Sequence, residues 1–164
     1  MEWQEQLQIL SQVAIAMALA ALIGLERELA HKPAGLRTHM LVSGAAALLV
    51  ALGFTIVRRF GAATQYPLVR VDPAVVIQAV VTAVGFLGAG TILHHARDGT
   101  PGDQVEGLTT AASLLFVAAL GTCVALRQNL LAGGVTALAL VTLRGVAILE
   151  RRIRKGRVTE PPRP

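Results

Sequence analysis

Five long stretches without acidic side chains constrain the fold of this chain most. They hold 19 to 21 residues each, and Arg144 is the one charged residue among them. A helix of about 20 residues rises about 30 Å, the thickness of a bilayer's hydrocarbon core. Barrel strands would alternate apolar and polar residues, which these stretches do not. The sequence therefore predicts an all-α, polytopic membrane helix bundle with about five transmembrane helices, at residues 7–25, 38–57, 74–93, 108–126 and 129–149.

The basic residues indicate an orientation. A net charge of +5 would suggest nucleic acid as the partner of a soluble protein, but in a membrane protein the positive-inside rule explains it better. Segments 26–37, 94–107 and 150–164 would share one side and hold ten Lys and Arg, whereas the opposite side holds four. We therefore expect the N-terminus outside, the C-terminus in the cytoplasm, the lipid bilayer as partner and no nucleic acid.

Little chain is left for other domains. We expect one transmembrane domain over residues 1–149 and a basic, Pro-rich cytoplasmic tail over residues 150–164. The connections are too short for a soluble catalytic domain. The sequence has no His-Glu-x-x-His motif, no paired intramembrane aspartates and no ordered Ser, His and Asp set. These features predict a protein that is not an enzyme and has no cofactor.

Three connections carry local signals. Thr38 is expected to cap the second helix, and Asp72 followed by Pro73 is typical of the start of the third. Arg127 and Gln128 are all that separate the last two helices, which must then form an antiparallel hairpin.

Three glycines interrupt the third apolar stretch, Gly85, Gly88 and Gly90. Small residues let membrane helices approach closely, so we expect these glycines to lie at a tight helix crossing. The alternative is a bent or broken helix that exposes backbone groups to a ligand.

Charged residues gather at the predicted cytoplasmic end of the first helix, where Glu26, Arg27 and Glu28 follow one another. Carboxylates are unfavourable at a helix C-terminus, so they need partners. We expect Arg37 to pair with Glu26 or Glu28. The alternative is a cation or anionic-ligand site, in which Glu26 and Glu28 are the weak candidates for binding a metal ion.

Hydroxyl groups mark the start of the fourth helix. Thr109 and Ser113 are four residues apart and share a face, and Thr109 or Thr110 is placed to cap the first turn. If that face met the glycines and Glu26, a polar pocket would form at the cytoplasmic boundary of the membrane.

The four histidines fit a surface or interfacial position better than a metal site. Adjacent residues on a helix point about 100° apart, so His94 and His95 are poor joint ligands for one ion. His31 and His39 are expected at the interface as well.

Four short motifs, taken in order, resemble the MgtC/SapB family of membrane proteins. They are GLERE at residues 24–28, KPAGLRTHML at 32–41, GFLGAGTIL at 85–93 and GLTTAASL at 107–114. The resemblance covers nearly the whole chain, from Leu7 to Leu149. The motif matches carry over as a functional polar cluster Glu26, Arg27, Glu28, Arg37, Thr38, Thr109, Thr110 and Ser113.

The resemblance implies a multi-pass protein of the bacterial cytoplasmic membrane, linked to magnesium limitation and to virulence in some pathogens. It also implies action through other membrane proteins rather than an established transport activity. This chain departs from the family pattern at Glu106 and His94, where basic residues are usual. Both changes make the cytoplasmic end more acidic.

Two functions follow as hypotheses. The first is a protein that modulates other membrane proteins, or associates with itself, in adaptation to low magnesium or host stress. The absence of Asp, Glu and His from the middle of the spans favours it, since ion pathways usually contain such residues. The alternative is a transporter or channel for Mg²⁺ or another small solute.

Overall fold

The structure, a computed structural model, describes residues 3–61, 72–97 and 103–157. Over those residues it consists of five α-helices and no strand. Each helix is long and apolar enough to cross a membrane, which confirms the predicted fold class. The helices are α1 (Trp3–Leu29), α2 (Leu36–Gly61), α3 (Pro73–Arg97), α4 (Asp103–Ala125) and α5 (Asn129–Arg157).

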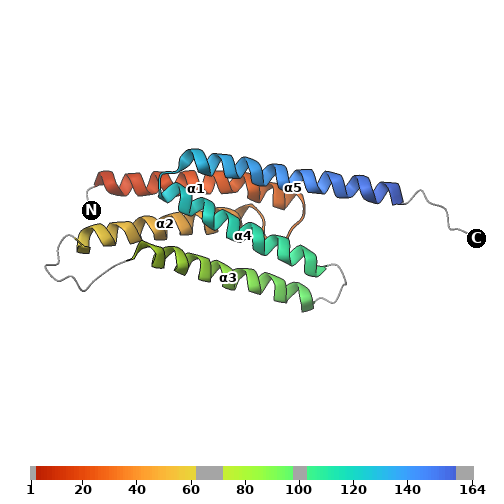
Figure 1. The fold of residues 1–164 in the computed structure, drawn as a ribbon, viewed down its shortest axis with the longest axis horizontal. Coiled ribbons are helices and arrows are strands. Elements are labelled where there is room, and N and C mark those ends of the chain that lie inside the picture. Colours follow the sequence, from red (N-terminus) through yellow and green to blue (C-terminus); the bar gives the residue numbers. More distant parts are fainter. Residues whose placement is uncertain (1–2, 62–71, 98–102, 158–164) are drawn as a thin grey trace, which may run out of the picture.

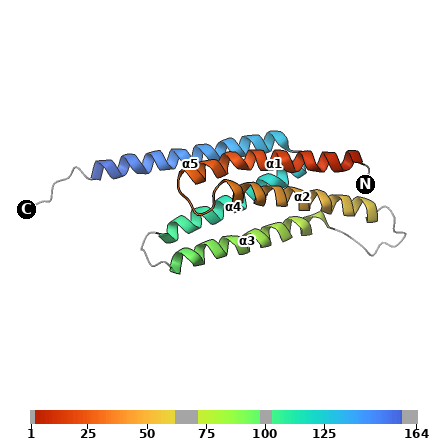
Figure 2. The ribbon, with the colours of Figure 1, turned by 180° about the vertical axis from the view of Figure 1, so that it is seen from behind.

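α4 is the central helix of the bundle and packs against all four others. Half of its membrane span is buried, against 11% of the span of α5. α1 and α2 form one antiparallel pair, and α3 lies against α2 and α4 (Figures 1 and 2). Burial of α4 on several sides explains why its sequence shows no single apolar face.

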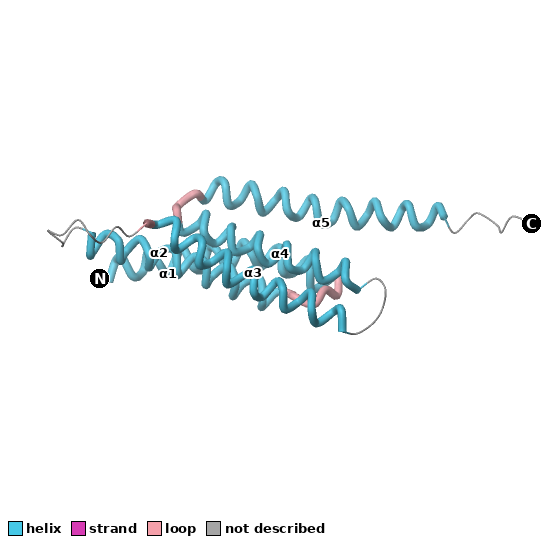
Figure 3. Tube along the Cα trace, turned by 60° about the horizontal axis from the view of Figure 1, so that its bottom comes forward, coloured by secondary structure: helices cyan, strands magenta, loops and turns pink. Residues whose placement is uncertain are grey.

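α5 lies along one side of the other four helices, against α1 and α4 (Figure 3). It runs in the same direction as α1 but is displaced along the bundle. The turn between α4 and α5 therefore lies short of the nearby ends of α1 and α2, and α5 extends beyond the bundle at the opposite end (Figure 1). The tail at residues 158–164 lies outside the described residues.

Small aliphatic side chains fill the middle of the bundle in two clusters. One joins α1, α2, α4 and α5 around Ala20, Ala47 and Val117, and the other joins α2, α3 and α4 around Val50 and Leu114. These five residues are at most 2% exposed. Alanine at these positions brings the helix backbones close together, which is how helices associate where lipid removes the hydrophobic driving force.

Two helices end in the same capping motif. After α1 the backbone N–H of Lys32 donates to Arg27, and after α4 that of Gln128 donates to Cys123. The residue at the left-handed position is His31 in one motif, with φ 55°, and Arg127 in the other, with φ 60°. Glycine usually occupies this place in a Schellman cap.

The helix starts agree with the sequence only in part. Asp72 caps α3 as predicted, because its carboxylate accepts a hydrogen bond from the N–H of Ala74 at 2.8 Å. Thr38 does not cap α2, which begins two residues earlier at Leu36. α4 begins at Asp103, so the prediction that Thr109 or Thr110 caps its first turn is also wrong. Both α2 and α4 therefore begin earlier than predicted, because the polar residues before each apolar stretch are already helical.

The outer surface of the bundle is strongly apolar. Leu130 is 94% exposed and Phe86 is 81% exposed, and they lie among many exposed aliphatic side chains. A soluble monomer rarely exposes so much contiguous apolar surface. Together with the five apolar spans, this surface indicates a bundle whose outer face meets lipid.

Candidate functional site

Ionisable and hydroxyl side chains are buried together where the end of α1 meets the start of α2 and the first half of α4. We call Glu26, Arg27, His39, Thr110 and Ser113 the buried polar cluster. All five are at most 9% exposed. Polar groups at such a depth need partners, because the low dielectric around them makes an unpaired group costly.

His39 links α2 to α4. Its Nδ1 lies 2.8 Å from the carbonyl oxygen of Gly35, and its Nε2 lies 3.0 Å from the hydroxyl of Ser113. The Ser113 hydroxyl in turn lies 2.8 Å from the carbonyl oxygen of Thr110. A hydroxyl has a single proton to donate. This series of hydrogen bonds therefore has two complete arrangements. In one, neutral His39 accepts a hydrogen bond from the hydroxyl of Ser113. In the other, doubly protonated His39 donates from both ring nitrogens, and the Ser113 hydroxyl donates to the carbonyl oxygen of Thr110.

The burial of His39 corrects the expectation of a surface or interfacial position. Its side chain is 0% exposed. The signal in the sequence is its spacing: His39 is four residues before Ser43, which is also fully buried, and both lie on the face of α2 that meets α1 and α4. His31 is exposed, and the side chains of His94 and His95 lie outside the described residues.

Glu26 and Arg27 form a buried ion pair that leaves other atoms unpaired. The shortest distance, from Arg27 Nη1 to Glu26 Oε2, is 3.7 Å. Arg27 Nε and Nη2 and Glu26 Oε2 have no hydrogen-bond partner. Buried ionisable groups near a membrane boundary that lack full hydrogen bonding are expensive, and they usually have a functional role.

Glu28 has a structural role in the connection between α1 and α2. Its carboxylate accepts a hydrogen bond from the N–H of Leu36 at 2.8 Å, which satisfies a free donor at the start of α2. Among the described residues neither Glu26 nor Glu28 pairs with Arg37, contrary to our expectation. Arg37 and Thr38 are exposed and do not join the buried polar cluster.

The hydroxyl residues of α4 divide between two environments. Ser113 and Thr110 belong to the buried polar cluster, whereas Thr109 is exposed. Thr109 and Ser113 border a groove of 270 Å³ between α1, α4 and α5, whose other lining residues are mostly apolar. The glycines of α3 do not line this groove, so the polar pocket expected from the sequence does not form there.

The glycines of α3 occupy different surroundings from one another. A Cβ at Gly88 would lie 3.2 Å from Ala111 Cβ, so α3 approaches α4 closely at this glycine. At Gly85 and Gly90 no neighbour lies within 4 Å, so the close crossing expected there is absent from the described bundle. α3 continues through all three glycines without a break.

Two glycines to which the sequence assigned no role, Gly24 and Gly121, bring helix backbones close together. A Cβ at Gly24 would lie 2.8 Å from the Cα of Leu36, and one at Gly121 would overlap the carbonyl oxygen of Ser43. Gly24 lets α1 approach the start of α2, and Gly121 lets α4 approach α2. These contacts hold the three helices of the buried polar cluster together.

Metal binding finds limited support at this end of the bundle. Within the described residues there is no group of three or more His, Cys, Asp or Glu that could hold a metal ion. Of the two weak candidates, Glu28 already accepts the hydrogen bond from Leu36. Glu26 Oε2 has no hydrogen-bond partner, although it forms the 3.7 Å ion pair with Arg27.

Five apolar spans around a buried polar cluster define a polytopic α-helical membrane protein. The sequence model of the MgtC family matches residues 13–152. The chain therefore belongs to the MgtC family, as its motifs indicated.

Curated relatives agree with this assignment. The chain is 41% identical over 115 residues to the Escherichia coli K12 protein named "Putative magnesium transporter YhiD", covering 69% of this chain and 48% of the relative. It is 36% identical over 113 residues to protein MgtC of Salmonella typhimurium LT2, covering 69% and 41%. It is 30% identical over 151 residues to an uncharacterized protein of Haemophilus influenzae, covering 92% and 60%.

This chain spans between two fifths and three fifths of the length of those three relatives. No solved structure matches it.

Proposed function

We propose that this protein is a regulatory component of the bacterial cytoplasmic membrane that modulates other membrane proteins through helix contacts, in adaptation to low magnesium or host stress. Membership of the MgtC family supports the link to magnesium. The asymmetry of Lys and Arg supports an orientation with the N-terminus outside and the C-terminus in the cytoplasm.

The observation that carries this proposal is the outer face of α5. Gly134 and Gly145 are eleven residues apart, about three helical turns, and therefore lie on one face. Neither has a neighbour within 4 Å of the place where a Cβ would be. Leu138 and Val141 lie between them on that face and are 66% and 69% exposed. Small residues at both ends of an exposed face would let a second transmembrane helix approach the backbone closely.

The middle of the bundle favours contact over conduction. Ala16, Ala20, Ala47 and Val117 are fully buried there in one apolar cluster, and the buried hydroxyl of Ser43 is satisfied by the carbonyl oxygen of Ala16. An ion pathway would need polar groups or water at that depth. The buried polar cluster lies at one end of this packed region, where it can respond to a change in the positions of α1, α2 and α4.

Site-specific photo-crosslinking in native membranes tests the proposal. A photoreactive residue at Val141 is expected to capture a membrane protein or a second copy of the chain. The same residue at Leu10, which is 63% exposed on α1, serves as the control. Gly134→Leu should reduce the capture from Val141, because a large side chain blocks close approach. Equal capture from both positions, or none from either, contradicts the proposal.

Transport of Mg²⁺ is the alternative, supported by the name of the Escherichia coli relative and by the buried Glu26 carboxylate, whose Oε2 has no hydrogen-bond partner. Mg²⁺ often binds one or two carboxylates while keeping several waters. Liposomes that contain the protein and a Mg²⁺ indicator should then show a flux that Glu26→Gln reduces and Glu5→Gln does not. A flux equal to that of protein-free liposomes would rule out transport.

A further inference from the structure

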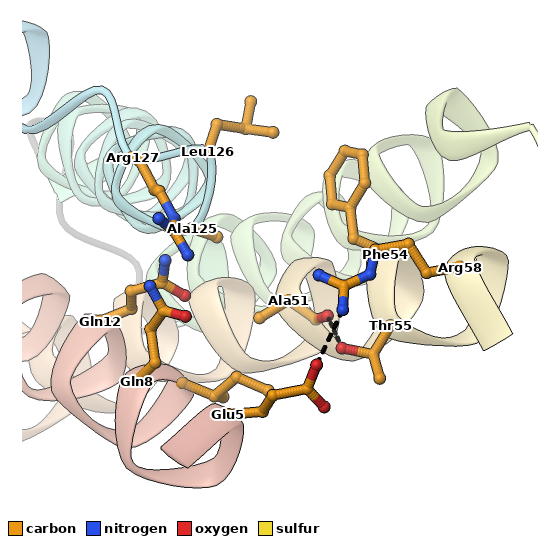
Figure 4. Close-up of a pocket in the computed structure, with 11 residues that line it drawn as sticks. Glu5, Gln8, Gln12, Ala51, Phe54, Thr55, Arg58, Ala125, Leu126 and Arg127 are labelled. Carbon is orange, nitrogen blue, oxygen red and sulfur yellow. Dashed lines mark hydrogen bonds and ion pairs between the residues drawn. The ribbon is translucent and has the colours of Figure 1, made fainter. Parts of the chain in front are cut away.

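A polar recess lies at the end of the bundle opposite the buried polar cluster. Its volume is 360 Å³, within the range of about 300–1,000 Å³ typical of small-molecule sites. The first turns of α1, the last turns of α2 and the turn between α4 and α5 form its walls (Figure 4). Its polar lining residues are Glu5, Gln8, Gln12, Thr55, Arg58 and Arg127.

The α4–α5 turn lies short of the nearby ends of α1 and α2 (Figure 1). Arg127 lies in this turn and lines the recess. Its side chain is exposed and points toward Gln8 and Gln12 across the recess (Figure 4).

The charges of the recess do not cancel. Arg58 Nη2 and Glu5 Oε1 form an ion pair at 2.7 Å, which neutralises both groups. Thr55 donates its hydroxyl to the carbonyl oxygen of Ala51. The guanidinium of Arg127 has no ion-pair or hydrogen-bond partner in the described part of the chain, so one positive charge remains.

Two carboxamides lie beside that charge. Gln8 and Gln12 are one helical turn apart on α1, and their side chains gather with Arg127 on one side of the recess (Figure 4). Among the described residues neither carboxamide has a hydrogen-bond partner. Three unpaired side chains thus present N–H donors to one space, around a single positive charge.

We propose that the recess binds an oxyanion, a phosphate or carboxylate group, through the Arg127 guanidinium and the carboxamides of Gln8 and Gln12. A guanidinium matches two oxygens of such a group with two parallel hydrogen bonds, and the carboxamide N–H groups reach the remaining oxygens. A metal cation fits less well, because the one carboxylate of the recess is already paired with Arg58. This site is independent of the function proposed above.

The same chemistry has two sources at a membrane surface. The oxyanion is either a small solute or the headgroup of an anionic phospholipid. We therefore design the experiment with one arm for each source, and the full-length protein is used in a phosphate-free, non-ionic detergent.

Titration calorimetry measures binding in both arms. The first arm uses inorganic phosphate and acetate. The second uses dihexanoyl-phosphatidylglycerol below its micellar concentration, with uncharged dihexanoylglycerol as its control. Binding in the first arm identifies a solute site, and binding in the second arm alone identifies a headgroup site. Either result supports the proposal, provided that it depends on Arg127.

The variants separate this site from general charge effects. Arg127→Gly should weaken binding at least tenfold without damaging the turn, because the φ of 60° suits glycine. Gln12→Leu should weaken it several-fold. Arg59→Gln is the matched control, because this substitution also removes one positive charge. Arg59 is exposed near the end of α2 and does not line the recess. Absence of binding in both arms, or equal loss in Arg59→Gln and Arg127→Gly, would overturn the proposal.

Discussion

Gly121 offers the sharpest test of how this bundle is packed. A Cβ at this position would overlap the backbone carbonyl of Ser43, and backbone cannot move aside as the end of a flexible side chain can. At Gly133 the corresponding space is empty. Both glycines lie inside helices, so replacement by alanine changes the intrinsic helix propensity equally. The comparison of Gly121→Ala with Gly133→Ala therefore isolates the contact between α4 and α2.

The magnitude follows from two opposing terms. Alanine in place of glycine favours a helix by about 1 kcal/mol. Overpacking a close contact costs about 1–3 kcal/mol, and more where backbone must move. Gly133→Ala should therefore leave the free energy of unfolding equal to or up to about 1 kcal/mol above that of the parent. Gly121→Ala should lower it by about 2 kcal/mol or more, because α2 and α4 must separate.

Cys123 provides the assay. It is the single cysteine of the chain, it lies two residues from Gly121 on α4, and it is partly buried against the core cluster of α1, α2, α4 and α5. A fluorophore that reacts with thiols should label it faster as α4 opens on heating. At about 2–4 °C per kcal/mol for a chain of this size, Gly121→Ala should melt at least several degrees below Gly133→Ala. Equal melting temperatures, or a higher one for Gly121→Ala, would refute the packing described here.

Three further predictions use the same assay. Ser113→Ala should lower the free energy of unfolding by about 1–3 kcal/mol, because it leaves the buried Nε2 of His39 without a partner; a change below 0.5 kcal/mol in either direction would contradict this role. Gly88→Val should destabilise the bundle by about 1–3 kcal/mol through its contact with α4, whereas Gly85→Val should not, and equal effects would show that the contact is unimportant. Arg58→Ala should change stability by less than about 1 kcal/mol, because its ion pair is exposed to solvent; a larger loss would mean that the pair has a structural role.

The spans were predictable because each one is a long apolar run, and a bilayer leaves few alternatives for such a run. The helix starts were less predictable. Thr38 is a residue type that often caps helices, yet α2 begins at Leu36. The reason is that the carboxylate of Glu28 accepts a hydrogen bond from the backbone N–H of Leu36 across the connection. A contact between residues eight positions apart in a turn leaves no periodic signal in a sequence.

The candidate site was predicted through its motifs rather than through its geometry. Glu26, Arg27 and Ser113 lie in the buried polar cluster, whereas Arg37 is exposed. The sequence favours an interfacial position for His39, because this residue lies only two residues after the predicted polar connection at residues 26–37. Its burial depends on Gly24, which lets α1 come within contact distance of the His39 Cβ. Such a close approach depends on how two helices cross, which one helix's pattern does not determine.

The recess was not predicted, and a signal for it exists. Glu5, Gln8 and Gln12 form a polar stripe along the first turns of α1. Such a stripe on a membrane helix indicates a face turned away from lipid. What the stripe does not reveal is the opposite wall, because the position of Arg127 depends on how far α5 is displaced along α1.

That displacement has a consequence for the membrane itself. The apolar runs of α1 and α5 are similar in length, 19 residues at 7–25 and 21 residues at 129–149, so each is long enough to cross a hydrocarbon core of about 30 Å. Because α5 is displaced along α1 (Figure 1), the two runs do not start at the same depth, and the apolar boundary is stepped between the two sides of the protein. Lipids beside the α4–α5 turn must thin or tilt to follow this step, at a cost of a fraction of a kcal/mol per Å of mismatch. The protein will therefore favour regions of membrane, or neighbouring proteins, that already supply an uneven boundary.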